Sequence, residues 1–379
     1  MSEKRKRRKR VLVRALIAVV VAVGVYAVWN TTRILRSFGD IERVKTDLEA
    51  ARSRLETALD SELPPPPPED TDTTEPPPKT DTEPPDENPD PDLSHLVGQQ
   101  LPYDPDFAAG PQFADELFDA FLIIGSDARE NLGGSRADVI ILALLPKEGS
   151  SPILVSLPRD LYLPNPCHRS PTRINAALNG CGDLANGPEL LALMIDEYTG
   201  IEPDHFALFD FENFVRVIDA VGGVTVCVEN PVRENMDLGF LELPEGCSVV
   251  NGTQALLWMR SRHTEEFVDG RWRTMPGVND LARTERQQKL LIEMLVKLGS
   301  FRDLGSLVDV VGSLADAVTI DEGITLGQVV GLAWDMRGLN PLTIGRVRPP
   351  VVFHTTAGGA SVLLPTQPFS EVLAEVYSP

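Results

Sequence analysis

The sequence lacks the motifs that mark several large enzyme classes. It has no Walker loop and no GxGxxG run after a strand-like segment, which argues against the common nucleotide-binding folds. It has no GxSxG turn, so the nucleophile elbow of the α/β-hydrolases is not expected. There is no CxxC pair of the kind that binds zinc. The five histidines form no spaced set of metal ligands, so each histidine is interpreted as structural or exposed: His95, His168, His205, His263 and His354.

Basic charge is also scarce over most of the chain. The 379 residues carry a formal net charge of −21, and residues 60–92 alone hold twelve acidic side chains against one lysine. Nucleic-acid binding requires a basic face, so no nucleic-acid partner is predicted. The acidic stretch is interpreted as a solvated linker.

The N-terminus is the exception to this acidity. Residues 1–10 form a basic tail that contains KRKRRKR, and residues 11–29 form an apolar run with a single arginine. The run is about long enough to span a bilayer, and the positive cluster should stay in the cytoplasm. A cleaved signal peptide would have a shorter apolar core. We therefore expect an uncleaved signal anchor: one transmembrane helix in the cell membrane, with the N-terminus cytoplasmic and the catalytic domain extracellular.

Two segments follow the predicted anchor. Residues 30–62 repeat apolar or small side chains every seven residues: Ile34, Ile41, Leu48 and Leu55, with Val44, Ala51 and Ala58. This pattern predicts either a weak coiled coil that forms homo-oligomers through residues 31–62 or an exposed juxtamembrane helix. Residues 63–112 begin with a run of proline and acid that cannot form a core, which predicts a disordered linker. Both segments are expected to hold the folded part away from the membrane.

Four cysteines lie in the part expected outside the cell. An even number of cysteines in an oxidising compartment favours disulfides, and four cysteines allow three pairings. We predict the pairing of sequence neighbours, Cys167 with Cys181 and Cys227 with Cys247.

The pattern of the remaining sequence predicts an α/β domain. Short apolar runs such as FLII, VIILALL and PILVSL are typical of strands, and helical patterns come between the later strands, for example at residues 188–200. Alternating strands and helices predict a central sheet with helices on both faces. We place a catalytic core at residues 113–296 and expect residues 297–379 to be an integral part of the same extracellular domain.

One loop between strand-like runs concentrates charge. Residues 125–138 read GSDARENLGGSRAD, with Asp127 and Asp138 each beside a strand end. Two carboxylates at one site repel unless a proton or a metal lies between them, and Mg²⁺ is held by one or two carboxylates together with substrate phosphates. Ordinary turn chemistry explains the same aspartates, so both interpretations stay open at this point.

Arginine, rather than lysine, supplies the positive charge of the domain. Residues 121–290 contain thirteen arginines and two lysines, and many of the arginines fall at the ends of predicted elements. A high-GC genome would produce the same bias. However, arginine is the side chain best suited to bidentate phosphate contacts, so the set predicts a positive cleft for a phosphorylated substrate.

Several ordered motifs resemble one family. GSDAR at 125–129, RAD at 136–138, PRD at 158–160 and RINAA at 173–177 come first, and VIDAVGGVTVCV, NGTQALLWMRSR and DLARTERQQ follow in order up to residue 288. In motif and spacing the chain resembles the LytR-CpsA-Psr family over roughly residues 120–296. The resemblance implies an α-β-α sandwich with a central mixed sheet, preceded by a single transmembrane helix.

The resemblance also implies an activity. Family members are Mg²⁺-dependent phosphotransferases, with Mn²⁺ as a substitute, that move a glycopolymer from a polyprenyl-pyrophosphate lipid to peptidoglycan, usually to the C6 hydroxyl of N-acetylmuramic acid. A polyprenyl-pyrophosphate phosphatase or a ligase that glycosylates a surface protein would use the same site. A non-catalytic cell-wall scaffold is the third reading, but the aspartates and arginines expected of an enzyme are present.

The family's functional residues are carried over by motif position. Metal binding is implied for Asp127 and Asp138, and catalytic roles for these two together with Arg136, Arg159 and Asp160. Asp127 or Asp160 would accept the proton of the attacking hydroxyl. Pyrophosphate contacts are implied for nine side chains: Arg129, Arg136, Arg159, Arg173, Arg260, Arg262, Arg283, Arg286 and Gln287.

Two further features go beyond this set. A tunnel for the lipid tail is implied, and we expect four apolar side chains to line it, with ordinary core packing as the alternative: Phe206, Phe211, Phe214 and Val215. The stretch at residues 263–279 is long for the family. Its Arg271, Trp272 and Arg273 either contact a sugar or phosphate or form a surface loop.

Overall fold

A computed structural model describes the main parts of the domain. The described residues are 38–61, 117–126, 136–147, 151–168, 170–236, 239–261, 263–275, 318–335 and 341–377, with isolated positions within 32–36 and 286–297. The predicted anchor at 11–29 and the linker at 63–112 lie outside them. Within the described part of the chain, no helix is long and apolar enough to cross a membrane.

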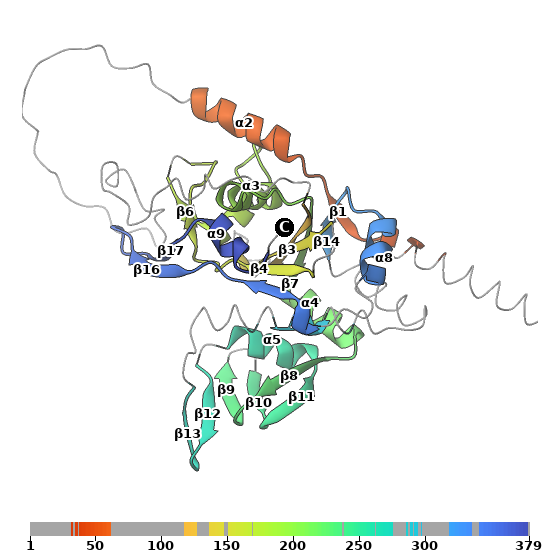
Figure 1. The fold of residues 1–379 in the computed structure, drawn as a ribbon, viewed down its shortest axis with the longest axis vertical. Helices are drawn as coiled ribbons and strands as arrows, with labels where there is room; N and C mark the ends of the chain where they lie inside the picture. The colour runs from red at the N-terminus through yellow and green to blue at the C-terminus, as the bar shows by residue number, and fades with distance from the viewer. Residues whose placement is uncertain are drawn as a thin grey trace, which may run out of the picture.

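A seven-stranded mixed sheet forms the centre of the molecule (Figure 1). Its strands, in spatial order, are β1 (Glu42–Val44), β14 (Thr319–Asp321), β7 (His205–Asp210), β2 (Phe118–Ser126), β3 (Ala137–Pro146), β4 (Ile153–Ser156) and β15 (Gly345–Val347). Three neighbouring pairs are parallel, namely β1–β14, β7–β2 and β4–β15, and the other three are antiparallel. The central mixed sheet predicted from the sequence is therefore confirmed.

Both faces of this sheet are covered, as expected from its apolar strands. Along β3, Ile140, Leu142 and Leu144 pack on one face, and Val139, Ile141 and Ala143 pack on the other. Side chains alternate across a strand, so an apolar strand of this kind needs a cover on each face. The first face packs against η3 (Ile174–Asn179), α3 (Gly187–Thr199) and α9 (Phe369–Ala374). The second packs against α4 (Phe211–Ala220) and α5 (Gly252–Arg260), which Figure 1 shows on the opposite side from α3.

Local sequence signals set the ends of these helices. Asn186 and Glu189 form a reciprocal capping box at the start of α3, and Gly200 ends the helix in the left-handed conformation with a φ of 68°. Asn251 and Gln254 form the same box at the start of α5. A third capping box opens α8 (Leu326–Asp335), where the side chains of Thr325 and Gln328 each accept the other's backbone N–H.

Smaller sheets extend the second face. A four-stranded sheet has the order β10 (Gly239–Leu243), β9 (Val232–Met236), β12 (Glu265–Val268) and β13 (Arg271–Thr274), and β8 (Val224–Val228) pairs with β11 (Gly246–Val250). The remaining pieces are β5 (Tyr162–Leu163) paired with β6 (Thr172–Arg173), β16 (Val351–Thr355) paired with β17 (Ser361–Pro365), and η4 (Pro341–Thr343).

The long stretch at residues 263–279 forms a hairpin as far as it is described. Strands β12 and β13 join through Asp269 and Gly270, both with positive φ, as a tight two-residue turn requires. The Trp272 ring lies 4.2 Å from the guanidinium carbon of Arg233 and 5.2 Å from the Phe267 ring. Arg273 pairs with the buried Glu266, and Arg271 is exposed. Trp272 and Arg273 therefore have partners within the hairpin and its neighbouring strands.

Both predicted disulfides are confirmed. Cys167 bonds Cys181 and so encloses β6 and η3, and Cys227 bonds Cys247 across the β8–β11 pair. All four cysteines are used.

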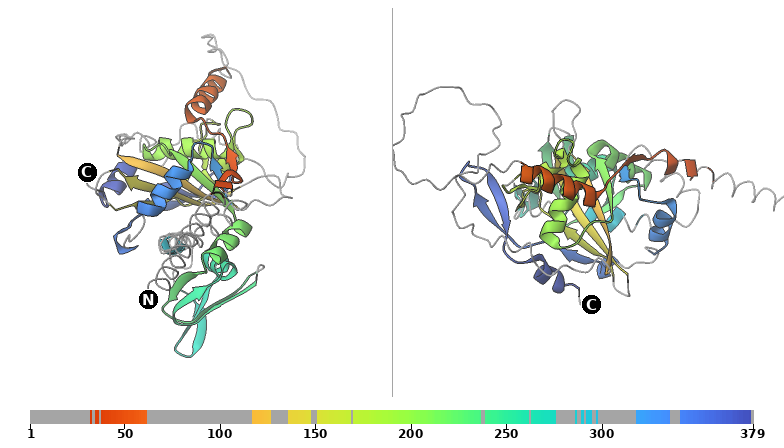
Figure 2. Two further views of the ribbon diagram at one scale, coloured as in Figure 1. Left: turned by 90° about the vertical axis from the view of Figure 1, so that its right-hand side faces the viewer. Right: turned by 90° about the horizontal axis from the view of Figure 1, so that it is seen from above.

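The segment from Phe38 onward belongs to the folded domain, because Phe38 packs against Ile320 and Ile324. This corrects the expectation of a spacer over residues 30–62. Strand β1 pairs in parallel with β14 at the edge of the central sheet, and helix α2 (Leu48–Ser61) lies on the outer side of α3 (Figures 1 and 2). Ala51 is 0% exposed and Leu55 is 2% exposed within the main core. The seven-residue spacing reflects this packing, and Ala51 and Leu55 are buried within the chain instead of forming a coiled-coil seam.

Polar contacts fix α2 in place. The buried carboxylate of Glu189 accepts the backbone N–H of Asp47 at 2.9 Å and lies 3.7 Å from the Arg54 guanidinium. Arg52 donates to Asp196 at 2.6 Å. Because the chain is integrated on both sides of it, the segment at 63–112 connects two parts of one domain. It therefore does not separate the domain from the apolar N-terminal run.

We predict that α2 contributes to the stability of the whole domain. Changing Leu55→Ala removes buried methyl groups and leaves a cavity, so the free energy of unfolding should fall by about 2–5 kcal/mol. Urea denaturation followed by circular dichroism measures this change. The exposed Glu56 on the same helix is the control, and Glu56→Ala should change the stability by no more than about 0.5 kcal/mol. Equal stability of the two variants would contradict the packing of α2.

A histidine–aspartate pair joins β7 to β14 and predicts a pH dependence. The hydrogen bond from His205 to Asp321, at 3.1 Å, raises the pKa of the imidazole above 6.5 against the opposing effect of burial, and the charges of Asp321, Asp204 and Asp119 act in the same direction as the bond. A histidine whose pKa is raised by folding stabilises the fold below its unfolded pKa, and this contribution is lost as pH rises through the folded pKa.

The stability of the wild type, relative to His205→Gln, should therefore decrease as the pH rises above 6.5. Thermal unfolding of both proteins across this range measures the difference. Parallel pH profiles would show that the pair does not titrate in the way its geometry indicates.

Candidate functional site

The candidate site begins at one edge of the central sheet. Strand β2 ends at Ser126, β7 ends beside it at Asp210, and β3 starts opposite it at Ala137. The end of β4 lies at the same edge, because β4 is antiparallel to β3. Asp127 follows Ser126 directly in sequence, but residues 127–135 lie outside the described part, and so does Arg129.

A β-bulge places Asp138 at this edge. Gly125 pairs with Val139 and Ser126 pairs with Ala137, so Asp138 is the extra residue between them. Bulges redirect a side chain and are frequent beside active sites. The close approach of the strands also explains Gly125, because a Cβ there would lie 2.9 Å from the Cβ of Val139. A glycine inside a strand pattern, such as Gly125, is therefore a sequence signal for a bulge of this kind.

A chain of alternating charges runs from Asp138. Arg159 donates from Nη1 to Asp138 Oδ1 at 2.7 Å, and its Nε lies 3.4 Å from Asp160 Oδ2. Asp160 Oδ1 lies 3.9 Å from the Nε of Arg173. The Asp138 and Arg159 side chains are only 14% and 21% exposed, so this pair is better shielded from water than a surface ion pair. The structure thus brings four of the predicted residues together.

Backbone hydrogen bonds hold the turn that carries Arg159 and Asp160. The carbonyl of Arg159 accepts the N–H of Asn175 at 3.2 Å, and the carbonyl of Asp160 accepts the N–H of Leu363 at 2.9 Å. The turn is therefore tied both to η3 and to β17. A side chain on a braced turn is better positioned for binding than one on an open loop.

Burial near the site keeps one phenol neutral. Tyr162 follows this turn on β5, and burial raises the pKa of its hydroxyl, with the positive charge of Arg173 acting in the opposite direction. Within the described residues, no three or more His, Cys, Asp or Glu side chains converge as metal ligands.

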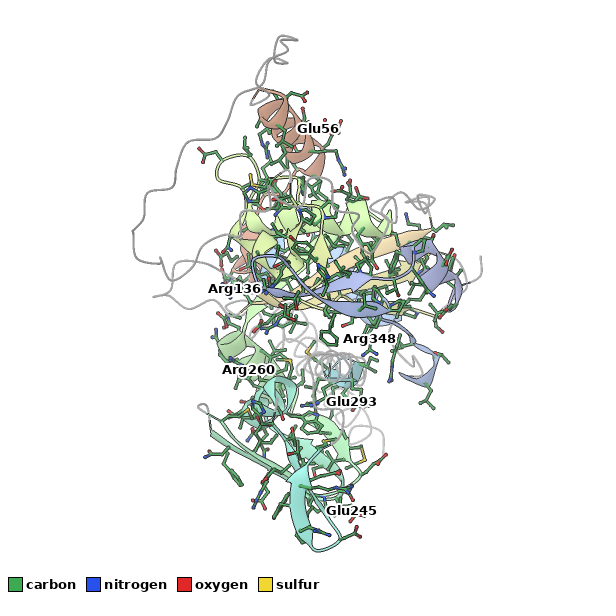
Figure 3. The ribbon with its side chains drawn as sticks, turned by 90° about the vertical axis from the view of Figure 1, so that its left-hand side faces the viewer. Glu56, Arg136, Glu245, Arg260, Glu293 and Arg348 are labelled. Atoms are coloured by element: carbon green, nitrogen blue, oxygen red, sulfur yellow. A yellow bond between two sulfur atoms is a disulfide. The ribbon has the colours of Figure 1, made fainter. Side chains whose placement is uncertain are left out.

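Two further arginines flank this edge. Arg136 directly precedes β3 and is exposed, and Arg260 is the last residue of α5 and is half-buried. Figure 3 shows both on the same side of the molecule in that view, with Arg260 between the central sheet and the smaller sheets.

Arg286 has a different environment from the one expected of a substrate ligand. It is 7% exposed and donates from Nη1 to the carbonyls of Trp258 at 3.1 Å and Ser261 at 3.0 Å. Its guanidinium also lies 4.6 Å from the Trp258 ring centroid. These bonds satisfy carbonyls at the C-terminal end of α5, so Arg286 braces the helix end that carries Arg260. Arg262, Arg283 and Gln287 lie outside the described residues.

The residues expected to line a lipid tunnel do not share one surface. Phe206 on β7 packs in the core between the sheet and α3, whereas Phe214 and Val215 on α4 pack on the opposite face. Phe206 and Phe214 are also buried, at 5% and 7% exposure. Phe206 and the pair Phe214 and Val215 therefore cannot line one common surface, and which of the two faces holds the lipid stays a prediction. The side chain of Phe211 is outside the description.

Sequence reasoning missed two acidic residues near the site. Asp210 caps α4 by accepting the backbone N–H of Asn213 at 2.7 Å, and an aspartate just before an amphipathic run is a recognisable N-cap signal. Glu234 is buried on β9 and accepts hydrogen bonds from the segment after α5. Glu234 belongs to none of the motifs, so no sequence signal points to it.

Known proteins resemble this chain in sequence and in fold. The probable cell wall biosynthesis protein LcpB of Corynebacterium glutamicum is 29% identical over 254 residues, covering 62% of this chain and 55% of that protein. The regulatory protein MsrR of Staphylococcus aureus is 29% identical over 224 residues, covering 58% of this chain and 61% of that protein. The chain thus spans less than two thirds of these relatives' length.

A solved structure of a LytR-Csp2A-Psr enzyme from Actinomyces oris superposes with a TM-score of 0.55 at 27% identity, covering 70% of this chain and 92% of that one. The TagV structure from B. subtilis has a TM-score of 0.56 at 20% identity, which shows the shared fold alone. The LytR_cpsA_psr family model matches residues 114–372, which include every described site residue. On this match over most of its length, the chain belongs to the LytR-CpsA-Psr family.

Proposed function

We propose that this protein is a phosphotransferase that moves a glycopolymer from a polyprenyl-pyrophosphate lipid to the C6 hydroxyl of N-acetylmuramic acid in peptidoglycan. The observation that carries the proposal is the charge chain from Asp138 through Arg159 and Asp160 to Arg173, held at one edge of the sheet. Family membership and the cell-wall name of the relative from C. glutamicum support it.

The chemistry requires the site to stabilise negative charge. The acceptor hydroxyl attacks the phosphorus next to the sugar, a new P–O bond forms, and the bond to the polyprenyl phosphate leaving group breaks. Phosphoryl transfer of this kind depends on positioning and electrostatics more than on covalent help from the protein. Arg159, Arg136 and Arg260 would contact the pyrophosphate, and the bonds that already hold Arg159 reduce the cost of ordering it.

The proton of the attacking hydroxyl needs an acceptor. Asp160 already faces Arg159 and Arg173, and a proton on its carboxylate would weaken both ion pairs. We therefore assign the general base to Asp127, which follows the last residue of β2 at the same edge.

We propose that a magnesium ion binds at Asp138 and Asp127. Asp138 places a carboxylate at the bulge, and Mg²⁺ is commonly held by one or two carboxylates together with substrate phosphates. Asp138 and Asp127 would hold the ion, with Mn²⁺ as a substitute. When bound, it would supply charge neutralisation at the pyrophosphate.

The proposal includes a location. We propose that residues 11–29 anchor the chain in the membrane and that the domain lies outside, next to the lipid-linked donor and peptidoglycan. The two disulfides support an oxidising compartment. Because residues 38–61 pack into the domain, the tether from the proposed anchor is limited to residues 30–37, which would keep the site near the lipid substrate.

The assigned site predicts the effect of two substitutions. Asp138→Ala and Arg159→Ala should each lower the rate of polymer transfer by about 10²–10³-fold. The first removes a carboxylate proposed to hold the metal ion, and the second removes a guanidinium proposed to contact the pyrophosphate. Radiolabelled lipid-linked donor and isolated peptidoglycan, assayed with Mg²⁺, provide the measurement.

A matched pair at the opposite edge of the same sheet controls for general effects. Asp119, near the start of β2, lies 3.5 Å from Lys147, just after the end of β3. Asp119→Ala and Lys147→Ala should keep wild-type transfer. Full activity of the Asp138 and Arg159 variants would refute the assigned site. Release of the polymer without attachment would favour the phosphatase, and attachment to protein would favour the ligase.

Metal removal gives a second prediction. Chelation with EDTA should abolish transfer, and added Mg²⁺ or Mn²⁺ should restore it, because the pyrophosphate charge would otherwise be incompletely neutralised. Ca²⁺, which is larger and prefers more ligands, should restore less activity. Undiminished transfer in EDTA would contradict the metal assignment while leaving the arginine site in place.

A further inference from the structure

A buried carboxylate holds the segment that leaves α5. Glu234 is 7% exposed, and its Oε2 accepts hydrogen bonds from the hydroxyls of Ser261 and Thr264, the latter at 3.2 Å. Its Oε1 accepts the backbone N–H of His263 at 3.0 Å. Ser261 and Thr264 are themselves only 1% and 0% exposed. One side chain on β9 therefore bonds three of the four residues that follow Arg260.

The same segment is held from a second direction. Arg286 donates to the carbonyls of Trp258 and Ser261, so Ser261 is bonded through its hydroxyl by Glu234 and through its carbonyl by Arg286. Ser261 is extended, with φ −56° and ψ 129°, and it ends α5 immediately after Arg260. The direction in which the chain leaves the helix is consequently fixed at the residue between the two motif arginines, Arg260 and Arg262.

We infer that Glu234 is a positioning residue for Arg260, the arginine at the end of α5 that is proposed to bind the pyrophosphate of the donor. The inference rests on the proposed function. A buried carboxylate is unfavourable unless several donors bond it, so Glu234 holds the segment that provides those donors in place. A binding site that is already ordered binds its ligand more tightly than one that the ligand must order. Glu234 itself does not touch the substrate.

Replacement by glutamine separates positioning from charge. A glutamine can accept the His263 N–H through its oxygen and donate to the two hydroxyls through its amide, because hydroxyls act as donors and acceptors. Glu234→Gln should therefore keep the segment in place. Glu234→Ala removes every bond from this side chain and leaves buried polar groups without their partner.

The test is equilibrium binding of geranyl pyrophosphate, a short lipid pyrophosphate, to the full-length protein in detergent with Mg²⁺. Glu234→Ala should raise the Kd by about 10–100-fold, because small misplacements of binding groups have effects of this size. Glu234→Gln should remain within about threefold of the wild type under the same argument. Glu242→Ala, an exposed carboxylate on the neighbouring strand β10, is the matched control and should bind as the wild type does.

A second variant keeps the inference testable where Glu234→Ala folds poorly. Ser261→Ala deletes one hydroxyl in the same network, and it should also weaken binding while the melting temperature changes little. If both variants bind the probe like the wild type at temperatures where they are folded, Glu234 is structural and the inference is wrong. If the wild type does not bind the probe, the proposed function fails together with it. If the wild type transfers polymer and the variants bind normally, this inference alone fails.

Discussion

The antiparallel pairing of β2 with β3 is the constraint on which the site depends. It returns the chain to the sheet edge where β2 ended, and the bulge in β3 between Ala137 and Val139 places Asp138 there. Parallel pairing with β7 brings Asp210 beside Ser126 at the same edge. Antiparallel pairing with β4 adds the turn that carries Arg159 and Asp160. Charged side chains from separate stretches of the sequence thus lie close together at one edge of the sheet.

Three arginines at and near the site are held by specific acceptors. Arg159 lies between two carboxylates, Arg173 faces Asp160, and Arg286 is bonded to backbone carbonyls beneath the end of α5. A guanidinium that is already bonded loses less conformational freedom when a phosphate binds. Glu234 on β9 likewise accepts the backbone N–H of His263, in the segment that follows α5. The smaller sheet that contains the β12–β13 hairpin therefore also contributes a contact to the segment after Arg260.

Much of this arrangement could be predicted from the sequence, for physical reasons. The strands were recognisable because they are apolar on both faces, and Asp138, Arg159, Asp160 and Arg173 lie in motifs that the fold brings together. The spacing of Ala51 and Leu55 predicts a coiled-coil seam, whereas both side chains are buried in the core of the domain. The two arrangements cannot be distinguished by spacing, because a coiled-coil seam and a core-facing helix stripe have nearly the same period. Phe206 was grouped with Phe214 because sequence distance does not show that a strand residue and a helix residue face opposite sides of a sheet. Glu234 could not be found, since its role depends on contacts between distant strands and loops.

The most direct test of this account follows the two phosphates of the donor through one turnover. A lipid-linked polymer with distinguishable labels in its sugar-proximal and lipid-proximal phosphates would be mixed with excess protein and peptidoglycan. The account predicts that the sugar-proximal label appears in a phosphodiester on N-acetylmuramic acid while the other label stays on the released polyprenyl phosphate. Recovery of the sugar-proximal label as free polymer phosphate, with peptidoglycan present, would contradict transfer as the function of this site.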